Sequence, residues 1–311
     1  MNYLITIIGP TAIGKTALSI KLAQHFNCDI LSCDSRQFFK EMSIGTAVPT
    51  TEELAAAPHH FIRNKSVFDT YTVGDFEQEA LPLLDQLFTK NNVQIMVGGS
   101  GLYVDAVLKG FDEFPEIDAS VREQINADYD KFGIEYLRQK LKESDPVYYQ
   151  KLEAENPQTL VNPQRMKRFV EVCLGTGKPY SGFLGKRSVQ RNFTPIIIGL
   201  QADREKMYER INLRVDNMMQ EGLLEEAKKL YPNKHLNALQ TVGYRELFDY
   251  FDRKITLAEA IEQIKTNTRR FAKRQITWFK RTENVHWFDY LTSVTEIIAV
   301  IEKQITDLKN S

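Results

Sequence analysis

One stretch of sequence decides the predicted fold: Gly9-Pro10-Thr11-Ala12-Ile13-Gly14-Lys15-Thr16. It fits the pattern G-x-x-x-x-G-K-[ST] and lies between a predicted strand, Tyr3–Ile8, and an amphipathic segment over residues 16–26. In such a loop the glycines let backbone N–H groups converge on an anion, and the helix N-terminus adds a positive dipole. Lys15 adds a charge and Thr16 can ligate Mg²⁺. We therefore expect a binding site for a di- or triphosphate.

Short apolar runs alternate with amphipathic stretches over residues 1–110. The runs are Tyr3–Ile8, Ile30–Cys33 and Val93–Val97, each followed by Gly or Asp. Strands separated by helical segments indicate a parallel α/β sheet. A further strand-like run returns at Pro195–Leu200, and the final third is predicted to be nearly all helix, with a long helix over Ala258–Lys280.

The strand signals disappear between Phe111 and about Gly185. Charged helical segments replace them, at Val121–Phe132, Ile134–Lys142 and Pro163–Leu174. We therefore expect an α/β core, made of residues 1–110 and 186–311, that is interrupted by a helical insertion domain over residues 111–185.

The overall charge is close to zero, with 40 Lys and Arg against 41 Asp and Glu and a net charge of −1. Such a chain has no global field that attracts nucleic acid or an anionic membrane, so a polyanion must be held by a local patch. Two basic segments are candidates. One is Gln164–Arg168 (QRMKR), and the other is Lys265–Arg281, with seven basic residues, no acidic one and interleaved aromatic residues. The alternative interpretation of the second segment is a solvated basic face over ordinary core packing.

Length and composition set further limits. A chain of 311 residues that is 42% hydrophobic can bury a real core, which excludes disorder of the whole. Its three cysteines are too few for a disulfide framework and indicate a reducing compartment. No apolar run approaches the roughly 18 residues of a membrane span. We expect a cytoplasmic protein without a membrane partner.

A carboxylate follows the second predicted strand. Most phosphate loops work with an apolar strand that ends in a metal-binding Asp, but here Val93–Val97 runs into Gly98-Gly99-Ser100-Gly101. Asp34 is the only carboxylate at a strand end near the loop, and in a parallel sheet it should face the loop's mouth. It could act as a general base or a metal ligand, or it could only cap a turn.

The chain closely resembles the tRNA dimethylallyltransferases, also called tRNA isopentenyltransferases. Eight blocks carry the resemblance, in family order: GPTAIGKTALSIKLA at the loop, DSRQFF with IGTAVP from residue 34, HHFI at 59–62, YTVGDF at 71–76, VGGSGLYVDAVLKG at 97–110, NPQRMKRFVEV at 162–172, TVGYRE at 241–246 and AKRQITWFK at 272–280. The resemblance implies a P-loop-kinase-like α/β core with an inserted all-helical domain and a helix-rich C-terminal third. It also implies transfer of a dimethylallyl group from dimethylallyl diphosphate to N6 of adenosine-37 in tRNAs that read codons starting with U.

The resemblance implies roles for individual residues in the reaction. Asp34 matches the general base that removes the proton of the amine. Thr11 lines the substrate site, and Arg214 contacts the diphosphate. The loop residues Gly9 to Thr16 would hold the diphosphate, with Mg²⁺ on Thr16 as the cofactor.

The resemblance also implies a tRNA-binding set. Residues Asp34, Ser35, Arg36 and Gln37 would read a flipped adenine, and Ser100 and Arg122 align with positions implicated in RNA contact. The remaining members would grip the anticodon stem-loop: Gln164, Arg165, Met166, Lys167, Arg168, Lys273, Arg274, Gln275, Trp278, Lys280 and Arg281. For Arg122 alone, a position on an ordinary helix surface is favoured over RNA contact. Arg210 lies one helical turn before Arg214, and a solvated surface charge and a functional role are equally favoured for it. We expect no obligate protein partner.

Other interpretations of the sequence stay open at this point. A small-molecule kinase of the nucleotide type would share the phosphate loop, and an adenylate-prenylating enzyme would share the loop and Asp34. A pure RNA-binding module is the option without catalysis. His59 and His60 are interpreted as loop residues, since adjacent side chains cannot share one face of a regular element.

Overall fold

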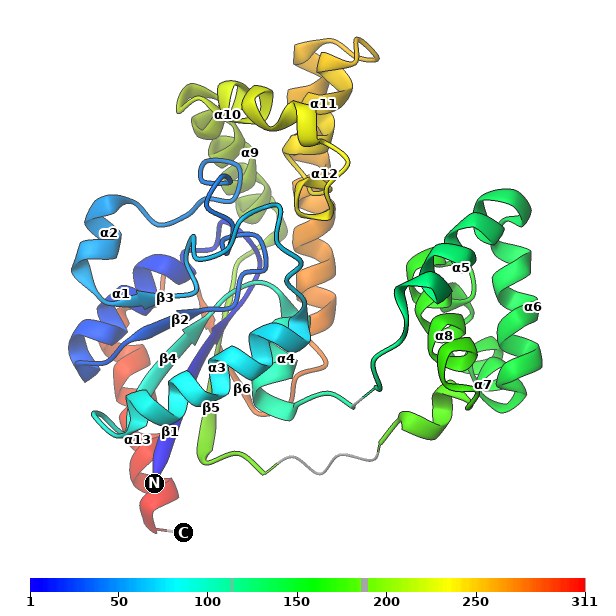
Figure 1. Cartoon of the computed structure of the whole chain (residues 1–311). Helices are drawn as coiled ribbons and strands as arrows, with labels where there is room; N and C mark the ends of the chain where they lie inside the picture. Colours follow the sequence, from blue (N-terminus) through cyan, green and yellow to red (C-terminus); the bar gives the residue numbers. More distant parts are fainter. Residues whose placement is uncertain (113, 186–189, 311) are drawn as a thin grey trace. The chain divides into compact units, whose positions relative to one another are not determined.

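The computed structural model describes residues 1–112, 114–185 and 190–310 and divides into two compact units. The sheet unit comprises Met1–Lys109 and Arg191–Ser311, and the helical unit comprises Gly110–Gln190 (Figure 1). The sequence places these boundaries after residues 110 and 185. Residue 186, where the core is expected to resume, lies outside the described residues.

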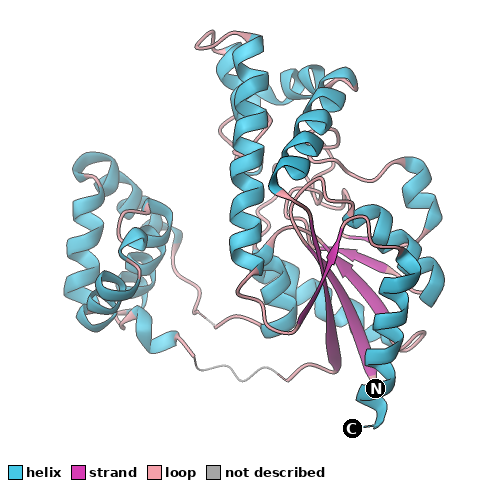
Figure 2. Ribbon diagram, turned by 180° about the vertical axis from the view of Figure 1, so that it is seen from behind, coloured by secondary structure: helices cyan, strands magenta, loops and turns pink. Residues whose placement is uncertain are grey.

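The sheet unit is built on six parallel strands in the order β3-β2-β4-β1-β5-β6 (Figure 2). The strands are β1 Asn2–Ile8, β2 Ile30–Ser32, β3 His59–His60, β4 Val93–Val97, β5 Phe193–Gln201 and β6 Val285–Asp289. Central β1 pairs with both β4 and β5, so that Ile5 lies opposite Ile95 on one side and Ile196 on the other. The predicted α/β class is confirmed.

Helices follow most strands. In the sheet unit they are α1 Lys15–Phe26, α2 Thr51–Ala56, α3 Val73–Phe88, α4 Gly101–Lys109, α9 Arg204–Gln220, α10 Leu223–Leu230, α11 Tyr244–Phe251, α12 Leu257–Phe279 and α13 Val294–Asn310, with short 3₁₀ turns η3 Tyr231–Asn233 and η4 Asn237–Leu239. Helices α9 to α12 extend beyond the carboxyl ends of the strands (Figure 1). They therefore lie over the edge of the sheet where parallel α/β folds bind ligands.

Two edge strands, β3 and β6, differ from the sequence-based expectation. His59 and His60 form the edge strand β3, where His60 Nε2 lies 2.7 Å from Asp29 Oδ2, so the prediction of a loop is wrong. Strand β6 lies in the third predicted to be nearly all helix. Both strands are at sheet edges and only partly buried, so neither shows the continuous apolar run that marks a central strand.

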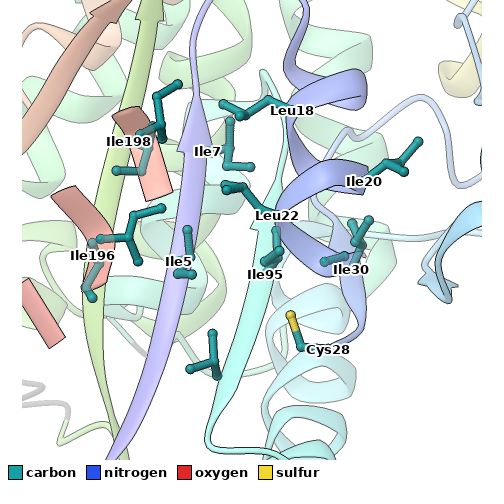
Figure 3. Close-up of a cluster of buried hydrophobic side chains, with 14 of the residues drawn as sticks. Ile5, Ile7, Leu18, Ile20, Leu22, Cys28, Ile30, Ile95, Ile196 and Ile198 are labelled. Carbon is teal, nitrogen blue, oxygen red and sulfur yellow. The ribbon is translucent and has the colours of Figure 1, made fainter. Parts of the chain in front are cut away.

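Each face of the sheet is covered by its own core. Odd residues of β1, such as Ile5 and Ile7, pack with α1 and α13, whereas even residues, such as Leu4, pack with α3 and α4. Figure 3 shows Leu22 of α1 beside Ile7 and Ile95 in the first of these cores. This packing fixes α1, and with it the loop that precedes α1, against the centre of the sheet.

The helical unit has a core of its own. Its helices are α5 Ala119–Phe132, α6 Ile134–Ser144, α7 Pro146–Glu155 and α8 Pro163–Thr176, with the 3₁₀ turns η1 Pro157–Thr159 and η2 Tyr180–Phe183. Asp118, Asp145 and Asn162 cap α5, α7 and α8 by accepting backbone N–H groups. Met166 is fully buried among Leu137 and other apolar side chains of this core.

Among the described residues, no helix is long and apolar enough to cross a membrane.

Removing the side chain of Leu22 should destabilise the sheet unit. Leu22 is fully buried, so Leu22→Ala leaves a cavity and should lower the free energy of unfolding by about 2–5 kcal/mol. Its neighbour Lys21 is exposed, and Lys21→Ala should change stability by less than about 0.5 kcal/mol. Urea unfolding followed by circular dichroism measures both. Equal effects of the two substitutions would contradict this description of the core.

Candidate functional site

The phosphate loop connects β1 to α1 and needs glycine at both of its pattern positions. Gly9 has a φ of +147°, and a Cβ there would lie 2.6 Å from the carbonyl oxygen of Leu200 in β5. Gly14 has a φ of +108° and no side chain with which to cap α1. The N-cap residue therefore offers no side-chain acceptor to the first N–H groups of α1, and these groups can donate to a bound anion. Helix N-termini commonly bind phosphate in this way.

Lys15 lies with its ammonium folded over the loop. Its Nζ donates to the carbonyl oxygens of Gly9 at 3.1 Å and Pro10 at 2.7 Å. Burial lowers the pKa of Lys15 to about 8, the nearby Asp34 carboxylate opposes that shift, and the Arg214 guanidinium adds to it. An anion bound to the loop would favour the charged form of this lysine.

Two side chains from outside the loop hold it in shape. The backbone N–H of Thr11 donates to Gln275 Oε1 at 2.9 Å, and Gln275 Nε2 donates to the carbonyl oxygen of Gly99 at 2.9 Å. Arg214 Nη1 donates to Thr11 Oγ1 at 3.2 Å. Helices α9 and α12 thus tie the loop to the segment that follows β4.

Arg210, one turn before Arg214, also contacts the loop. Its Nε donates to the carbonyl oxygen of Ala12 at 2.8 Å, and its guanidinium lies 5.0 Å from the centre of the Tyr290 ring. The interpretation of Arg210 as a solvated surface charge is therefore wrong. Ala12 itself has a φ of +63°, and the bond from Arg210 holds this left-handed conformation.

Asp34 follows β2 and faces the loop. Its Oδ1 accepts the backbone N–H of Arg36 at 3.1 Å, which fixes one oxygen of the carboxylate in a turn. Its charge acts on both Lys15 and Arg214 and favours their charged forms. Burial works in the opposite direction and lowers the pKa of Arg214. The carboxylate thus lies in a site where charge is only partly solvated.

Two cavities meet at Asp34. The first, of about 640 Å³, is lined by the phosphate loop, and the second, of about 460 Å³, is lined by Tyr103, Phe271 and Trp278 among others. The residues common to both linings are Thr11, Asp34, Thr46, Ala47, Arg214, Met218 and Gln275. One cavity therefore suits a diphosphate and the other a flat ring, and the three residues predicted to be catalytic lie on the wall that both share.

The side chains that are predicted to contact the flipped adenine also line these cavities. They form hydrogen bonds within the protein as well. Ser100 Oγ accepts the backbone N–H of Ser35 at 3.1 Å and donates to its hydroxyl at 3.1 Å. Arg36 Nη1 donates to the carbonyl oxygens of Asn237 and Ala238 in η4. The Nε2 of Gln37 donates to the carbonyl oxygens of residues 46 and 47. These side chains therefore line the cavities and also fix the backbone segments that form the cavity walls.

The predicted basic segment, Lys265–Arg281, runs along α12 and just past its end, and it divides into two parts. In its first half, Lys265 pairs with Asp216 at 2.8 Å, and Arg269 donates to Asn212. In its second half, exposed cations follow one another: Lys273, Arg274, Lys280 and Arg281. Trp278 is half-buried, donates from Nε1 to Asp105 Oδ2 at 2.8 Å and covers Gly101. Gln275, predicted to contact tRNA, is only 6% exposed and holds the phosphate loop.

The remaining predicted tRNA contacts belong to the helical unit. Arg122 and Arg168 both donate to Glu171 Oε2, at 2.8 and 3.1 Å. Lys167 Nζ donates to Asn126 and lies over the Tyr129 ring. Two exposed residues of this group are Gln164 and Arg165. Met166 points into the core, because in a helix it shares a face with Val170 and Cys173, so its side chain is not a surface contact.

Sequence reasoning missed the contribution of residues 43–48. Thr46 and Ala47 line both cavities, and Gly45 lines the second. The block IGTA carried part of the resemblance, but no role was assigned to it. The available signal was a glycine beside small residues, Gly45-Thr46-Ala47, between the Asp34 turn and α2, and it could not show which helix the loop packs against.

A magnesium ion is compatible with this site only together with a ligand. Among the described residues no group of three or more His, Cys, Asp and Glu side chains could hold a metal ion by itself. Thr16 and Asp34 line the cavity beside the loop and offer hard oxygen atoms, which Mg²⁺ prefers, and phosphate oxygens and water commonly complete its shell.

Comparison with known proteins assigns the family. The model of the family described as IPP transferase matches residues 37–282, most of the chain. The protein belongs to the IPP transferase family. Among its relatives, a tRNA dimethylallyltransferase of Flavobacterium psychrophilum is 71% identical over 98% of this chain and 99% of its own length. Another from Flavobacterium johnsoniae is 68% identical over the whole of both chains.

Solved structures of IPP transferases share the fold. The full-length tRNA isopentenylpyrophosphate transferase of Bacillus halodurans is 36% identical, with a TM-score of 0.73 over the whole of both chains. A eukaryotic dimethylallyltransferase acting on tRNA is 25% identical, with a TM-score of 0.82 over 99% of this chain and 80% of that one.

The affinity of the loop for a diphosphate ester should fall as the pH rises from 7 to 9. Lys15 is charged below its pKa of about 8 and loses its proton above that pH, so the attraction weakens. Calorimetric titration at several pH values measures this. In Lys15→Arg the guanidinium stays charged throughout, so the decline should be much smaller. The same decline in both proteins would show that Lys15 is not its source.

Proposed function

We propose that this IPP transferase moves the dimethylallyl group of dimethylallyl diphosphate to N6 of adenosine-37 in tRNAs that read codons starting with U. The products are N6-dimethylallyladenosine and diphosphate. One observation carries the proposal: Asp34, Thr11 and Arg214 lie on the wall between a phosphate-loop cavity and a cavity lined by aromatic and basic residues. The names of the similar proteins support the same chemistry.

Asp34 is the proposed general base. The exocyclic amine of adenine is a poor nucleophile because its lone pair is delocalised into the ring, so its proton must leave as nitrogen bonds to carbon. A carboxylate on the shared wall can accept that proton while the adenine occupies the second cavity. The allylic C–O bond breaks in the same event, and the electron pair leaves with the diphosphate.

The phosphate loop stabilises the departing diphosphate. The N–H groups at the start of α1, the ammonium of Lys15 and the guanidinium of Arg214 all line the cavity where the negative charge builds up. Thr16 would hold Mg²⁺, which when bound supplies further positive charge to the diphosphate oxygens. The hydroxyl of Thr11, held by Arg214, can donate to the diphosphate.

The tRNA would reach this site by extruding one base. A base inside a folded anticodon loop must leave its stack, at a cost of a few kcal/mol. The exposed cations at the end of α12 can neutralise backbone phosphates, and Gln164, Arg165, Lys167 and Arg168 of the helical unit offer further contacts. We place the reaction in the cytoplasm, a reducing compartment that suits three free, buried cysteines.

Nucleotide-kinase chemistry is not favoured. Strand β4 is followed by glycines and Ser100, and no carboxylate stands there to coordinate the metal of a nucleoside triphosphate.

The proposal is tested by incubating the purified protein with unmodified tRNA, dimethylallyl diphosphate and Mg²⁺. Mass spectrometry of the digested tRNA should show one dimethylallyl group added to a single adenosine, and diphosphate should be released in equal amount. An unmodified tRNA accompanied by hydrolysis of ATP or phosphorylation of a nucleoside would overturn the proposal.

Replacing Asp34 should separate catalysis from binding. Asp34→Ala and the isosteric Asp34→Asn both remove the base, so turnover should fall by about 10²–10⁴-fold. The affinity for tRNA, measured by filter binding, should change little, because most phosphate contacts lie elsewhere. A large loss of tRNA affinity with unchanged turnover would contradict the role of base.

Neutralising the two cations that directly follow α12 should weaken tRNA binding in a salt-dependent way. Lys280→Ala combined with Arg281→Ala removes two exposed cations, so the slope of log K against log [salt] should fall by about 2. Binding titrations from low to moderate salt measure the slope. The matched control, Lys303→Ala with Lys309→Ala, removes two exposed cations from α13 and should leave the slope unchanged. Equal effects of the two pairs would show that α12 has no special part in binding.

A further inference from the structure

A loop between β2 and α2 forms part of both cavities. We call residues 43–48 the wall loop. Ile44 lines only the cavity beside the phosphate loop, Gly45 lines only the second cavity, and Thr46 and Ala47 line both. The wall loop therefore borders the passage in which the two substrates of the proposed function would meet.

A carboxylate of α10 holds the backbone of the wall loop. Glu226 Oε2 accepts the N–H groups of Ser43 at 3.0 Å and Ile44 at 2.9 Å, and its Oε1 accepts the N–H of Gly45 at 3.0 Å. The hydroxyl of Tyr244 donates to Oε1 at 2.6 Å. One side chain thus binds three consecutive N–H groups, and a phenol fixes its own position.

The wall loop is also fixed from its other sides. Gln37 Nε2 donates to the carbonyl oxygens of Thr46 at 3.2 Å and Ala47 at 2.9 Å. Gly45 lies so close to the fully buried Tyr244 that a Cβ there would come within 2.6 Å of its ring. Gln37 thus holds the carbonyl side of the wall loop, and Glu226 supplies the side-chain acceptors on its N–H side.

We propose that Glu226 is a positioning residue that sets the passage between the two cavities by clamping the wall loop. The inference rests on the proposed function, because it concerns the place where the amine and the allylic carbon approach each other. Glu226 lines neither cavity, so it acts through the wall loop and not on the substrates. Reacting atoms that are misplaced by about 1 Å can lose about 10²-fold in rate.

The test is Glu226→Gln, which keeps the shape of the side chain but turns one acceptor into an NH₂ group that opposes a backbone donor. We expect kcat per folded molecule to fall by about 10–100-fold and KM for tRNA to change by less than about threefold. The control is Glu225→Gln, which makes the same charge change at an exposed neighbour on α10 and should keep the kcat of the wild type. A merely structural role would lower the folded fraction and leave kcat per folded molecule intact.

Amide hydrogen exchange measures how firmly Glu226 holds the N–H groups of the wall loop, and it does not depend on turnover. Residues 43–45 should lose protection in Glu226→Gln and keep it in Glu225→Gln. Wild-type kcat in folded Glu226→Gln, or unchanged protection of residues 43–45, would overturn the proposal. If that variant does not fold, Tyr244→Phe decides, because it removes one of the four hydrogen bonds to Glu226. It should lower kcat and protection in the same direction by a smaller factor, and wild-type values of both would overturn the proposal.

The two proposals fail in different ways. A wild-type protein that transfers no dimethylallyl group to tRNA overturns the proposed function. A fully active wild type together with an equally active, folded Glu226→Gln overturns only the role of Glu226.

Discussion

The site of this protein depends on the strained backbone conformation of the phosphate loop. Between β1 and α1 the backbone takes positive φ angles at Gly9, Ala12 and Gly14, which only glycine adopts without strain. The N–H groups at the start of α1 can then face an anion. Lys15 bonds to the loop from within, and Gln275 and Arg210 add hydrogen bonds from helices that are distant in sequence.

The shape of the phosphate loop also determines the surroundings of the charged groups beside it, Lys15 and Asp34. Lys15 bonds to carbonyl oxygens of its own loop, and its burial without a bound anion lowers its pKa to about 8. Asp34 lies opposite and partly restores its charge. In the proposed function, a diphosphate in the loop would give Lys15 an anionic partner, and Asp34 lines the second cavity as well as the first. Charge near zero over the whole chain is therefore compatible with strong local fields.

Much of the sheet and of the phosphate site could be predicted from the sequence, because both rest on local patterns. The strand Val93–Val97 and the loop at Gly9 to Thr16 are contiguous, and their residue types leave few alternatives. The edge strands β3 and β6 could not be recognised, since a half-exposed strand lacks an apolar run. Met166 shows a related limit: the basic cluster at residues 164–168 predicts one exposed surface, although every third or fourth position of a helix turns inward.

The sequence by itself determined the phosphate loop, the parallel α/β class, the helical insertion and the presence of a carboxylate after the second strand. Only the tertiary structure decided which side chains complete the site. Gln275 and Arg214 reach the loop from α12 and α9, and Glu226 and Tyr244 reach the wall loop from α10 and α11. The contacts of Gln275 and Arg214 with Thr11 span 264 and 203 positions, and that of Glu226 with Ser43 spans 183. No local period or spacing encodes such a pairing, because it depends on how whole helices pack over the ends of the strands.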